Sequence, residues 1–345
     1  MSELLHVDGS KGGGSLVRNA IALSLITEKP FRIDSIRENR DSPGLKHQHY
    51  ESIVLAKNVS SSKVVNHRKG SREIEFYPGA MKNSNTSIDI GTAGSISLCL
   101  QSVMLPAIIK GKKLNMTVTG GTDVKFSPSV DYLNKVYLHT FRNICDYEVN
   151  VEVRGYYPEG GGRASVTIDG DGGGFSPLQR DMVGKPIYVR GVSHASSDLQ
   201  KQEVAERQKK AVEILLSDVD APLDIQAVYS KSKSTGSGVT VWVLAGDGSK
   251  RVVGSFVPGE KGVKSEDVGE RAAKRVRKML ESDELDTYML DQHILPLALF
   301  GGVVRSHSVD NHARANMYLC RKFLDTTFEE EDGEVRVKNS FLSMH

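Results

Sequence analysis

The sequence predicts an α/β (α+β) fold made of tandem repeated units. Along the first half, a short alternating strand is followed by a glycine-rich turn and an amphipathic helix, and this pattern returns several times. The 33 glycines are clustered, and such clusters indicate backbone that turns tightly or approaches a ligand closely. A length of 345 residues suggests about two domains, since ~100–200 residues per domain is usual.

The first copy of the pattern begins almost at the first residue. A short apolar strand leads into a glycine turn at 8–14, and the helix that follows ends before Pro30, which cannot continue it. A second helix carries apolar side chains at helical spacing after a polar loop at 37–44. In chain order, we expect strands at 4–7, 31–36 and 74–76, and helices at 15–29 and 45–59.

The pattern recurs between residues 88 and 168. Glycine turns at 91–95 and 120–123 each follow a short strand and precede a helix. A third glycine turn, at 155–162, joins two antiparallel strands. We expect strands at 88–90, 114–119, 149–153 and 164–168, a helix that ends near 109, and a helix that starts near 129.

A glycine-rich stretch at 170–177 leads into a segment with its own strands and helices. After this segment the chain again resembles the first half, so the order predicts a domain inserted into another. Within the insert we expect strands at 187–192, 224–229, 239–244 and 252–257, and helices at 201–216 and 265–280; after it, helices at 288–300 and 309–324 and a hairpin that turns at Asp332-Gly333.

Composition excludes several classes of protein. Lys and Arg number 45 against 43 Asp and Glu, which leaves a formal charge of +2, so any contact with nucleic acid must come from a local patch. The basic runs Arg207–Lys210 and Arg271–Lys278 are interpreted as solvated helix faces, with an RNA-binding surface as the weaker alternative. No run of ~18 apolar residues occurs, so no membrane span is expected.

The cysteines and histidines offer no evident metal site. Cys99, Cys145 and Cys320 are odd in number and form no CxxC pair, so we expect reduced core cysteines and a cytoplasmic protein without a signal peptide. His47 and His49 are two apart on a predicted helix and therefore point apart, which makes them a poor metal pair.

The turn from Asp8 to Ser15 lies between a strand and a helix, where exposed amides and the helix dipole attract anions. It is not a Walker A loop, because Lys11 precedes the glycines instead of following them. A phosphate-binding loop and a tight packing turn fit this pattern equally well.

Two further motifs are candidates for chemistry. His307 and His312 flank the start of a predicted helix, where the dipole lowers a histidine pKa and favours a neutral, nucleophilic imidazole. A capping or surface histidine is the simpler alternative. Asp291-Gln292 stands just before the apolar helix 294–300 and could bind a ribose or a base, or act as an ordinary helix cap.

Taken together, these motifs resemble the RNA 3′-terminal phosphate cyclase family over nearly the whole chain, and their order and spacing are specific where each alone is weak. Ser127-Pro128 with Asp131-Tyr132 is similar to archaeal members. The motifs are Asp8-Gly9-Ser10 with the triple glycine and Arg18, Ile36-Arg37 and Arg40, Pro43-Gly44-Leu45, Gln48-His49, Gly91 to Ser95, Leu100-Gln101, Leu105-Pro106, Gly120 to Asp123, Tyr157-Pro158 with Gly160 to Gly162, Asp291-Gln292, Leu295-Pro296, and His312 before Asn316.

The resemblance implies ATP-dependent conversion of an RNA 3′-phosphate end to a 2′,3′-cyclic phosphodiester, through an adenylyl-histidine on His312 and an RNA adenylate. It implies repeated units of a four-stranded sheet with two helices in 1–177 and 284–345, and a smaller α/β domain inserted at 178–283. ATP and a divalent metal, Mg or Mn, are the implied cofactors. The implied nucleotide contacts are Gln101, Pro128, Tyr288, Met289, Leu290, Asp291 and Gln292, and the implied RNA or phosphate contacts are Arg18, Arg37, Arg40 and Gln48.

The first glycine loop departs from the family pattern D-G-x-x-G-E-G-G-G-Q. It is about two residues short, it lacks the metal-associated glutamate, and Ser15 replaces the glutamine. The metal ligands are therefore left open, and we hypothesise that Lys11 supplies positive charge instead.

Three other functions are weighed against the active cyclase. A noncatalytic cyclase-like protein, acting in ribosome assembly or RNA binding, would explain the missing glutamate but not the presence of His312. An enolpyruvyl-transferase-like enzyme shares repeated α/β units but needs a different order of basic residues. A plain nucleotide-binding module would need no nucleophile.

Overall fold

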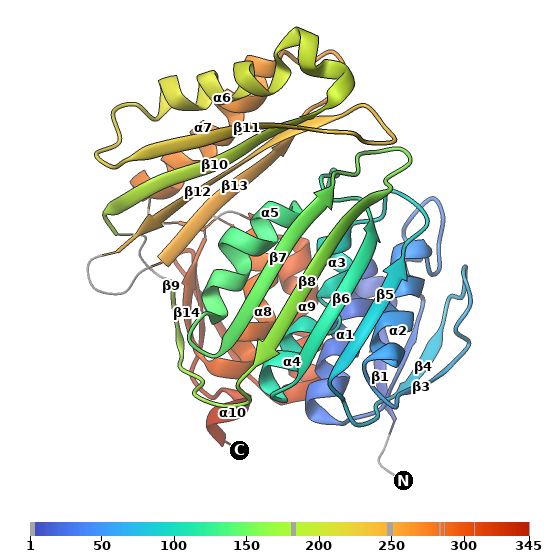
Figure 1. Cartoon of the computed structure of the whole chain (residues 1–345). Coiled ribbons are helices and arrows are strands. Elements are labelled where there is room, and N and C mark those ends of the chain that lie inside the picture. Colours follow the sequence, from blue (N-terminus) through green and yellow to red (C-terminus); the bar gives the residue numbers. More distant parts are fainter. Residues whose placement is uncertain are drawn as a thin grey trace.

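The computed structural model describes residues 4–180, 184–246, 251–282, 284–285, 287–306 and 308–344, and leaves the side chains of Arg180, Thr287, Tyr288, Ser343 and Met344 undescribed. These residues form four four-stranded sheets, each with parallel and antiparallel pairs, together with about ten helices. The predicted α/β class is confirmed at this level (Figure 1).

The first sheet has the order β1-β2-β4-β3, with β1 and β2 parallel and the other pairs antiparallel. Its strands are β1 (Leu5–Asp8), β2 (Phe31–Asp34), β3 (Lys63–Val65) and β4 (Ile74–Tyr77), and its helices are α1 (Gly14–Thr27) and α2 (His47–Asn58), with a 3₁₀ turn η1 (Gly9–Lys11) before α1.

The second sheet repeats that order and those directions as β5-β6-β8-β7. Its strands are β5 (Ser84–Asp89), β6 (Lys113–Gly120), β7 (Cys145–Val153) and β8 (Gly162–Gly170), and its helical segments are α3 (Ile96–Leu100), α4 (Met104–Ile109), α5 (Val130–Tyr132), a π-helical turn η2 (Leu133–Tyr137) and a 3₁₀ turn η3 (Leu138–Phe141).

The C-terminal sheet, read from β9, has the same order again: β9-β14-β16-β15, with only the first pair parallel. Its strands are β9 (Leu178–Arg180), β14 (Gly302–Arg305), β15 (Phe328–Glu331) and β16 (Glu334–Val337), and its helices are α8 (Thr287–Phe300), α9 (Asn311–Leu324) and α10 (Phe341–Met344).

The remaining sheet has a different order, β11-β10-β12-β13, in which β10 and β11 are parallel. Helices α6 and α7 cover one of its faces, and its other face lies toward α5 and β7 (Figure 1). Its elements are β10 (Pro186–Ser196), the 3₁₀ turn η4 (Ser197–Gln202), α6 (Val204–Leu215), β11 (Leu223–Ser230), β12 (Ser237–Ala245), β13 (Arg251–Pro258) and α7 (Ser265–Ser282).

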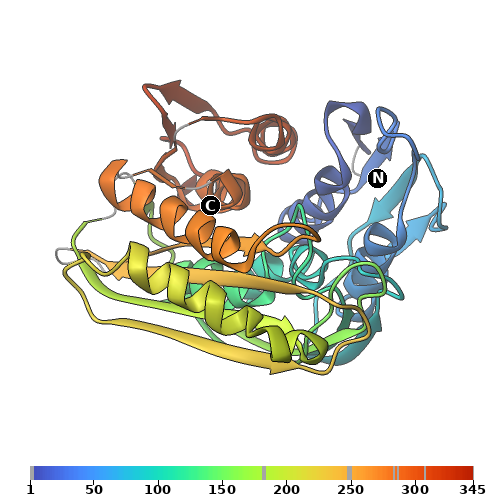
Figure 2. The same ribbon diagram turned by 90° about the horizontal axis from the view of Figure 1, so that it is seen from above.

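Seen from above, the N-terminal and C-terminal parts of the chain lie on opposite sides, behind the yellow and orange segment of β10–β13 (Figure 2). Helix α1 packs against α2, α4 and α9, and α8 packs against α9. Because α1 is enclosed in this way, it is buried from Ser15 to Ile26, polar side chains included. The candidate functional site lies around the buried polar residues of α1.

Several predicted boundaries are wrong for identifiable reasons. The strand expected at 31–36 ends at Asp34, because Ser35 and Arg37 have φ values of 48° and 56°. The single helix expected from residue 129 is divided into α5, η2 and η3. The short strand β9 was not predicted, and it pairs with β14.

Candidate nucleotide and phosphate site

A small pocket lies among α1, α8 and the segment that joins α3 to α4. It is lined by Asn19, Gln101, Leu105, Tyr137, Asp291, Gln292 and Leu295. Three of the residues expected to contact the nucleotide, Gln101, Asp291 and Gln292, therefore share one cavity, although they are far apart in the sequence.

A buried arginine lies beside this pocket. Arg18 Nε donates a 2.7 Å hydrogen bond to Gln101 Oε1. Burial lowers the pKa of Arg18 to about 10, while the nearby Asp291 acts in the opposite direction. At neutral pH the guanidinium stays charged, so a fixed cation lies beside the pocket, away from bulk water.

A chain of amide and carboxylate groups orients Asp291. Asn19 Nδ2 donates to Asn316 Oδ1 at 2.8 Å, and Asn316 Nδ2 donates to Asp291 Oδ1 at 2.6 Å. Burial raises the pKa of Asp291, whereas Arg18 and His312 act to lower it. Asp291 lies inside α8, one turn from its start, so the expectation that it precedes the helix is wrong.

His312 lies in the first turn of α9, as predicted, and its side chain is exposed. The helix is capped by Asp310, whose Oδ1 accepts a 2.8 Å hydrogen bond from the amide of Ala313. Asn316 is four residues further on and so lies on the same side of α9 as His312. His312 is also near enough to Asp291, at the end of the polar chain, for its charge to lower the pKa of that carboxyl. His307 lies outside the described residues.

The glycine loop before α1 leaves the start of that helix open. Gly13 offers no side-chain cap and the first turn of α1 has no acidic residue. Ser15 Oγ is buried and has no hydrogen-bond partner within the described part of the chain. The loop also packs closely on α9, since a Cβ atom on Gly12 would lie 2.9 Å from the Cβ of Ala315. Free amides, an unsatisfied hydroxyl and a helix N-terminus together favour an anion.

His49 faces this same helix start. Its Nδ1 accepts a 3.2 Å hydrogen bond from the amide of Lys46, so Nε2 carries the proton of the neutral ring. A Cβ atom on Gly14 would lie 1.8 Å from Nε2, which places that N–H against the glycine loop. Burial, followed by the charges of Arg18, Arg37 and Lys46, lowers the pKa of His49 to about 3. The ring is neutral at physiological pH.

Comparison with known proteins agrees with this geometry. The model of the family "RNA 3′-terminal phosphate cyclase" matches residues 10–329. This chain belongs to that family. An RNA 3′-terminal phosphate cyclase from Saccharolobus solfataricus is 40% identical over 333 residues, covering 94% of this chain and 96% of the relative. Cyclases from Archaeoglobus fulgidus and Pyrococcus furiosus are 36% and 37% identical over 97% of this chain and 100% and 98% of their own lengths.

The resemblance inferred from the motifs is thus confirmed. The chain is an enzyme of the cyclase family, and the family implies the use of ATP.

Two of the remaining predicted residues contact the glycine turns. Arg40 lies near the glycine loop, because a Cβ atom on Gly13 would be 3.6 Å from its Nη2. Gln48 Oε1 accepts from the amide of Ser95 at 3.0 Å and so fixes the turn at 91–95.

Other predicted residues do not reach the cavity through their side chains. Arg37 Nη1 donates to the carbonyls of Ser42 and Gly44, at 2.7 and 3.0 Å, and so holds its own loop. Burial and the charge of Arg40 lower the pKa of Arg37.

Three further residues expected to contact the nucleotide, Pro128, Met289 and Leu290, do not line the cavity. The carbonyl of Pro128 accepts a 2.5 Å hydrogen bond from Ser97 Oγ. Met289 and Leu290 are core residues, and the Tyr288 side chain lies outside the described residues.

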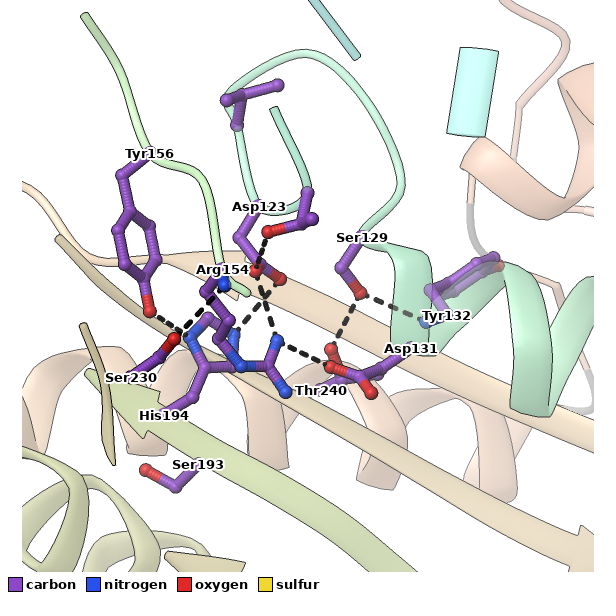
Figure 3. A network of polar contacts seen from close by, with 12 residues as sticks. Asp123, Ser129, Asp131, Tyr132, Arg154, Tyr156, Ser193, His194, Ser230 and Thr240 are labelled. Atoms are coloured by element: carbon purple, nitrogen blue, oxygen red, sulfur yellow. Dashed lines mark hydrogen bonds and ion pairs between the residues drawn. The ribbon is translucent and has the colours of Figure 1, made fainter. Parts of the chain in front are cut away.

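A second buried polar cluster was not predicted from the sequence (Figure 3). Arg154 Nη1 lies 3.0 Å from Asp123 Oδ2 and 2.8 Å from Asp131 Oδ2. His194 Nε2 lies 3.1 Å from Asp123 Oδ1, and its Nδ1 is hydrogen-bonded to the Tyr156 hydroxyl at 2.9 Å. Although burial opposes it, the charges of His194 and Arg154 lower the pKa of Asp123. His194 lies on β10, so the cluster joins the second sheet to the inserted segment.

Asp123, Asp131 and His194 are close enough to hold a metal ion, with one ligand atom from each within 4.8 Å of the others. Arg154 already pairs with both carboxylates, however, so a metal ion would compete with a buried guanidinium. The donor set does not fit a divalent metal while Arg154 is present. Asp123 belongs to a glycine turn that the motifs identified, but nothing in the sequence spacing relates it to Arg154 or His194.

Several basic side chains of α6 and α7 are paired with acids. Arg207 forms a bidentate ion pair with Glu266, and Arg277 pairs with Asp218. The cysteines are buried and free, as predicted. Across the described ranges, no helix has the length and apolar character needed to span a bilayer.

Proposed function

We propose that this chain uses ATP to convert an RNA 3′-phosphate end to a 2′,3′-cyclic phosphodiester, with His312 as the nucleophile. The observation that carries the proposal is the position of His312 at the open end of the buried chain Asp291–Asn316–Asn19. Membership of the cyclase family supports the reaction class.

In the first step, an imidazole nitrogen of His312 attacks the α-phosphorus of ATP. A P–N bond forms, the bond to the β-phosphate oxygen breaks, and pyrophosphate leaves. The carboxylate of the buried Asp291 stabilises the positive charge that develops on the imidazole of His312. Gln101 and Gln292 hold the nucleotide in the pocket they share, and Arg18, bonded to Gln101 beside that pocket, supplies positive charge.

In the second step, an oxygen of the RNA 3′-phosphate attacks the phosphorus of the adenylyl group, and the P–N bond breaks to release His312. The 2′-hydroxyl then attacks the activated 3′-phosphorus, loses its proton and expels AMP. Dividing the reaction in this way replaces a poor leaving group with AMP. Phosphate oxygens are held by the open start of α1, where Ser15 Oγ, His49 Nε2 and Arg40 converge.

A divalent metal, Mg or Mn, is part of the proposal only as a companion of the triphosphate, because such ions are usually held by substrate phosphates and water with one or two carboxylates. Lys11 stands in the loop where the family has a glutamate, and we assign it the role of a positive charge for the phosphates. No step is assigned to a metal on Asp123, Asp131 and His194.

The organisation of the chain is inferred in the same way. The common strand order of the first, second and C-terminal sheets supports three repeated units in 1–177 and 284–345. The different order of β10–β13 supports an inserted unit. The pairing of β9 with β14 supports moving the start of that insert from residue 178 to about 186. A cytoplasmic location remains a prediction.

The decisive experiment is incubation with ATP labelled at the α-phosphate and divalent metal. We expect acid-labile label on the wild type, no label on His312→Ala, and normal labelling of His6→Ala, a matched change of an exposed histidine. Label that survives in His312→Ala would refute the assigned nucleophile. An unlabelled wild type would favour the noncatalytic alternative, to which the missing loop glutamate points.

A further inference from the structure

Two aromatic side chains are unusually exposed. Phe126 is 89% exposed and Tyr157 is 77% exposed, whereas most large apolar residues of the chain are buried. Neither lines the nucleotide pocket. Large aromatic rings held in water suggest a surface that is covered when a partner binds.

The loops that carry these rings are fastened to each other. The amides of Thr122 and Asp123 both donate to the carbonyl of Gly155, at 2.9 and 3.3 Å. Phe126 is three residues after Asp123 and Tyr157 is two residues after Gly155, so the two rings belong to loops that meet at one edge of the molecule. Figure 1 shows the loop between β7 and β8 at the upper end of the second sheet, next to the sheet formed by β10–β13.

The same edge is continuous with the candidate site. The backbone at Gly160 lies against the turn at 91–95, since a Cβ there would be 2.6 Å from the carbonyl of Thr92. Gln48 holds that turn. The next residue of α2, His49, faces the start of α1. We call these loops, residues 9–14, 91–95, 120–128 and 155–161, the loop rim. A strand of nucleic acid that entered the site would lie along this rim.

Both rings are held outward by their neighbours. Phe126 has a φ of 61°, a conformation that non-glycine residues adopt at a cost, and Ser127 Oγ donates to the carbonyl of Val124 to close the turn. Lys125 is held by an ion pair of 2.6 Å with Glu260. Beside Tyr157, the buried Tyr156 is bonded to His194, and the amide of Glu159 donates to Ser234 Oγ.

We propose that Phe126 and Tyr157 form a stacking platform for the bases at the 3′ end of single-stranded RNA. This inference rests on the proposed function. Aromatic faces stack on any base, so such a platform would bind an RNA end whatever its sequence.

Two lysines beside the rim suit the same occupant. Lys231 and Lys233 are exposed and have no ion pair among the described residues, and the Lys233 side chain lies against Gly161. They would face the phosphodiesters that follow the stacked bases. Glu159 lies in the same loop, and its negative charge would weaken the attraction between these lysines and the phosphodiesters.

The test uses a 3′-phosphorylated RNA oligonucleotide with 2-aminopurine as its last base, whose fluorescence is quenched by stacking. We expect quenching by the wild type, and about tenfold weaker binding for each of Phe126→Ala and Tyr157→Ala, which corresponds to ~1.4 kcal/mol. Phe126→Tyr and Tyr157→Phe should bind as the wild type does. Tyr77→Ala, a matched change of an exposed tyrosine on β4, should also have no effect.

Labelling with ATP separates this proposal from the proposed function. The alanine variants should form labelled enzyme at the wild-type rate, because neither ring lines the nucleotide pocket. If the double variant Phe126→Ala/Tyr157→Ala bound and quenched the RNA as the wild type does, the stacking proposal would be wrong. The labelling result would be unaffected. An unlabelled wild type would overturn the reaction, and the quenching experiment would still decide whether the rings stack on RNA.

The lysines provide a second arm. Lys231→Ala with Lys233→Ala should lower the slope of log binding constant against log salt by about 1.4, since each phosphate contact on a single strand contributes ~0.7. Glu159→Gln should bind RNA more tightly. A salt slope identical to that of the wild type would remove the lysines from the proposal.

Discussion

His49 occupies the space that a side chain on Gly14 would need, because a Cβ atom there would lie 1.8 Å from His49 Nε2. Gly14→Ala should therefore push the imidazole away from the start of α1. We expect a loss of about 1–3 kcal/mol in unfolding free energy, as in other overpacked sites, together with slower labelling by ATP. Gly173→Ala, where a Cβ meets nothing within 4 Å, is the matched control. Equal denaturation midpoints for the two variants would contradict this geometry.

His49 also predicts a pH dependence. Its folded-state pKa of about 3 lies below the usual 6.5, so the unfolded chain takes up a proton that the folded chain refuses. The stabilisation is fully present above pH 6.5 and is lost as the pH falls toward 3, with a slope approaching ~1.4 kcal/mol per pH unit. His49→Gln should flatten that slope in denaturant titrations between pH 6.5 and 4. A variant with the wild-type slope would exclude His49 as its origin.

Arg18 and Gln101 are expected to act as one unit. Because Arg18 Nε donates to Gln101 Oε1 at 2.7 Å in a buried setting, either truncation leaves a polar group without its partner. In a double-mutant cycle of Arg18→Met and Gln101→Leu, measured by ATP labelling, we expect a coupling energy of about 0.5–3 kcal/mol. Additive effects would mean that the two side chains act separately. Arg32→Met, an exposed arginine paired with Glu73, serves as the surface control.

Arg154 should be essential for folding. Arg154→Met leaves Asp123 and Asp131 buried without their cation, so we expect a loss of about 3–5 kcal/mol in unfolding free energy. Arg163→Met removes an exposed ion pair with Glu152 and should change stability by at most about 1 kcal/mol. Restoration of Arg154→Met stability by added Mn²⁺ would show that a cation can replace the guanidinium. Wild-type stability should not respond to Mn²⁺ at this cluster.

Lys11 gives a direct test of how this chain manages without the loop glutamate. If Lys11 supplies positive charge to the phosphates, Lys11→Ala should lower the rate of ATP labelling about tenfold while leaving thermal stability unchanged, because its side chain is exposed. Lys29→Ala is the control at the other end of α1. Undiminished labelling of Lys11→Ala would refute the hypothesis.

The sequence was informative where structure is local. Alternating strands, glycine turns and apolar helices identified most elements of the first two sheets, and motif order brought Gln101 and Asp291 into one predicted site. It failed where the cause is distant. Strand β9 is three residues long and exists because β14 pairs with it. Arg154 and His194 meet Asp123 only through the packing of two sheets, and no spacing along the chain encodes that contact.

Both ends of the segment that carries β10–β13 return to the same strand. At its start β9 pairs with Gly302 to Val304, and at its end Leu285 bridges Ser306, one residue beyond β14. Excising about 100 residues would thus leave two stumps near each other, which a short peptide could join at little entropic cost. We therefore expect the segment to be exchangeable for another. The graft would have to supply a replacement for His194 and Thr240, which are its polar contacts to Asp123 and Ser129.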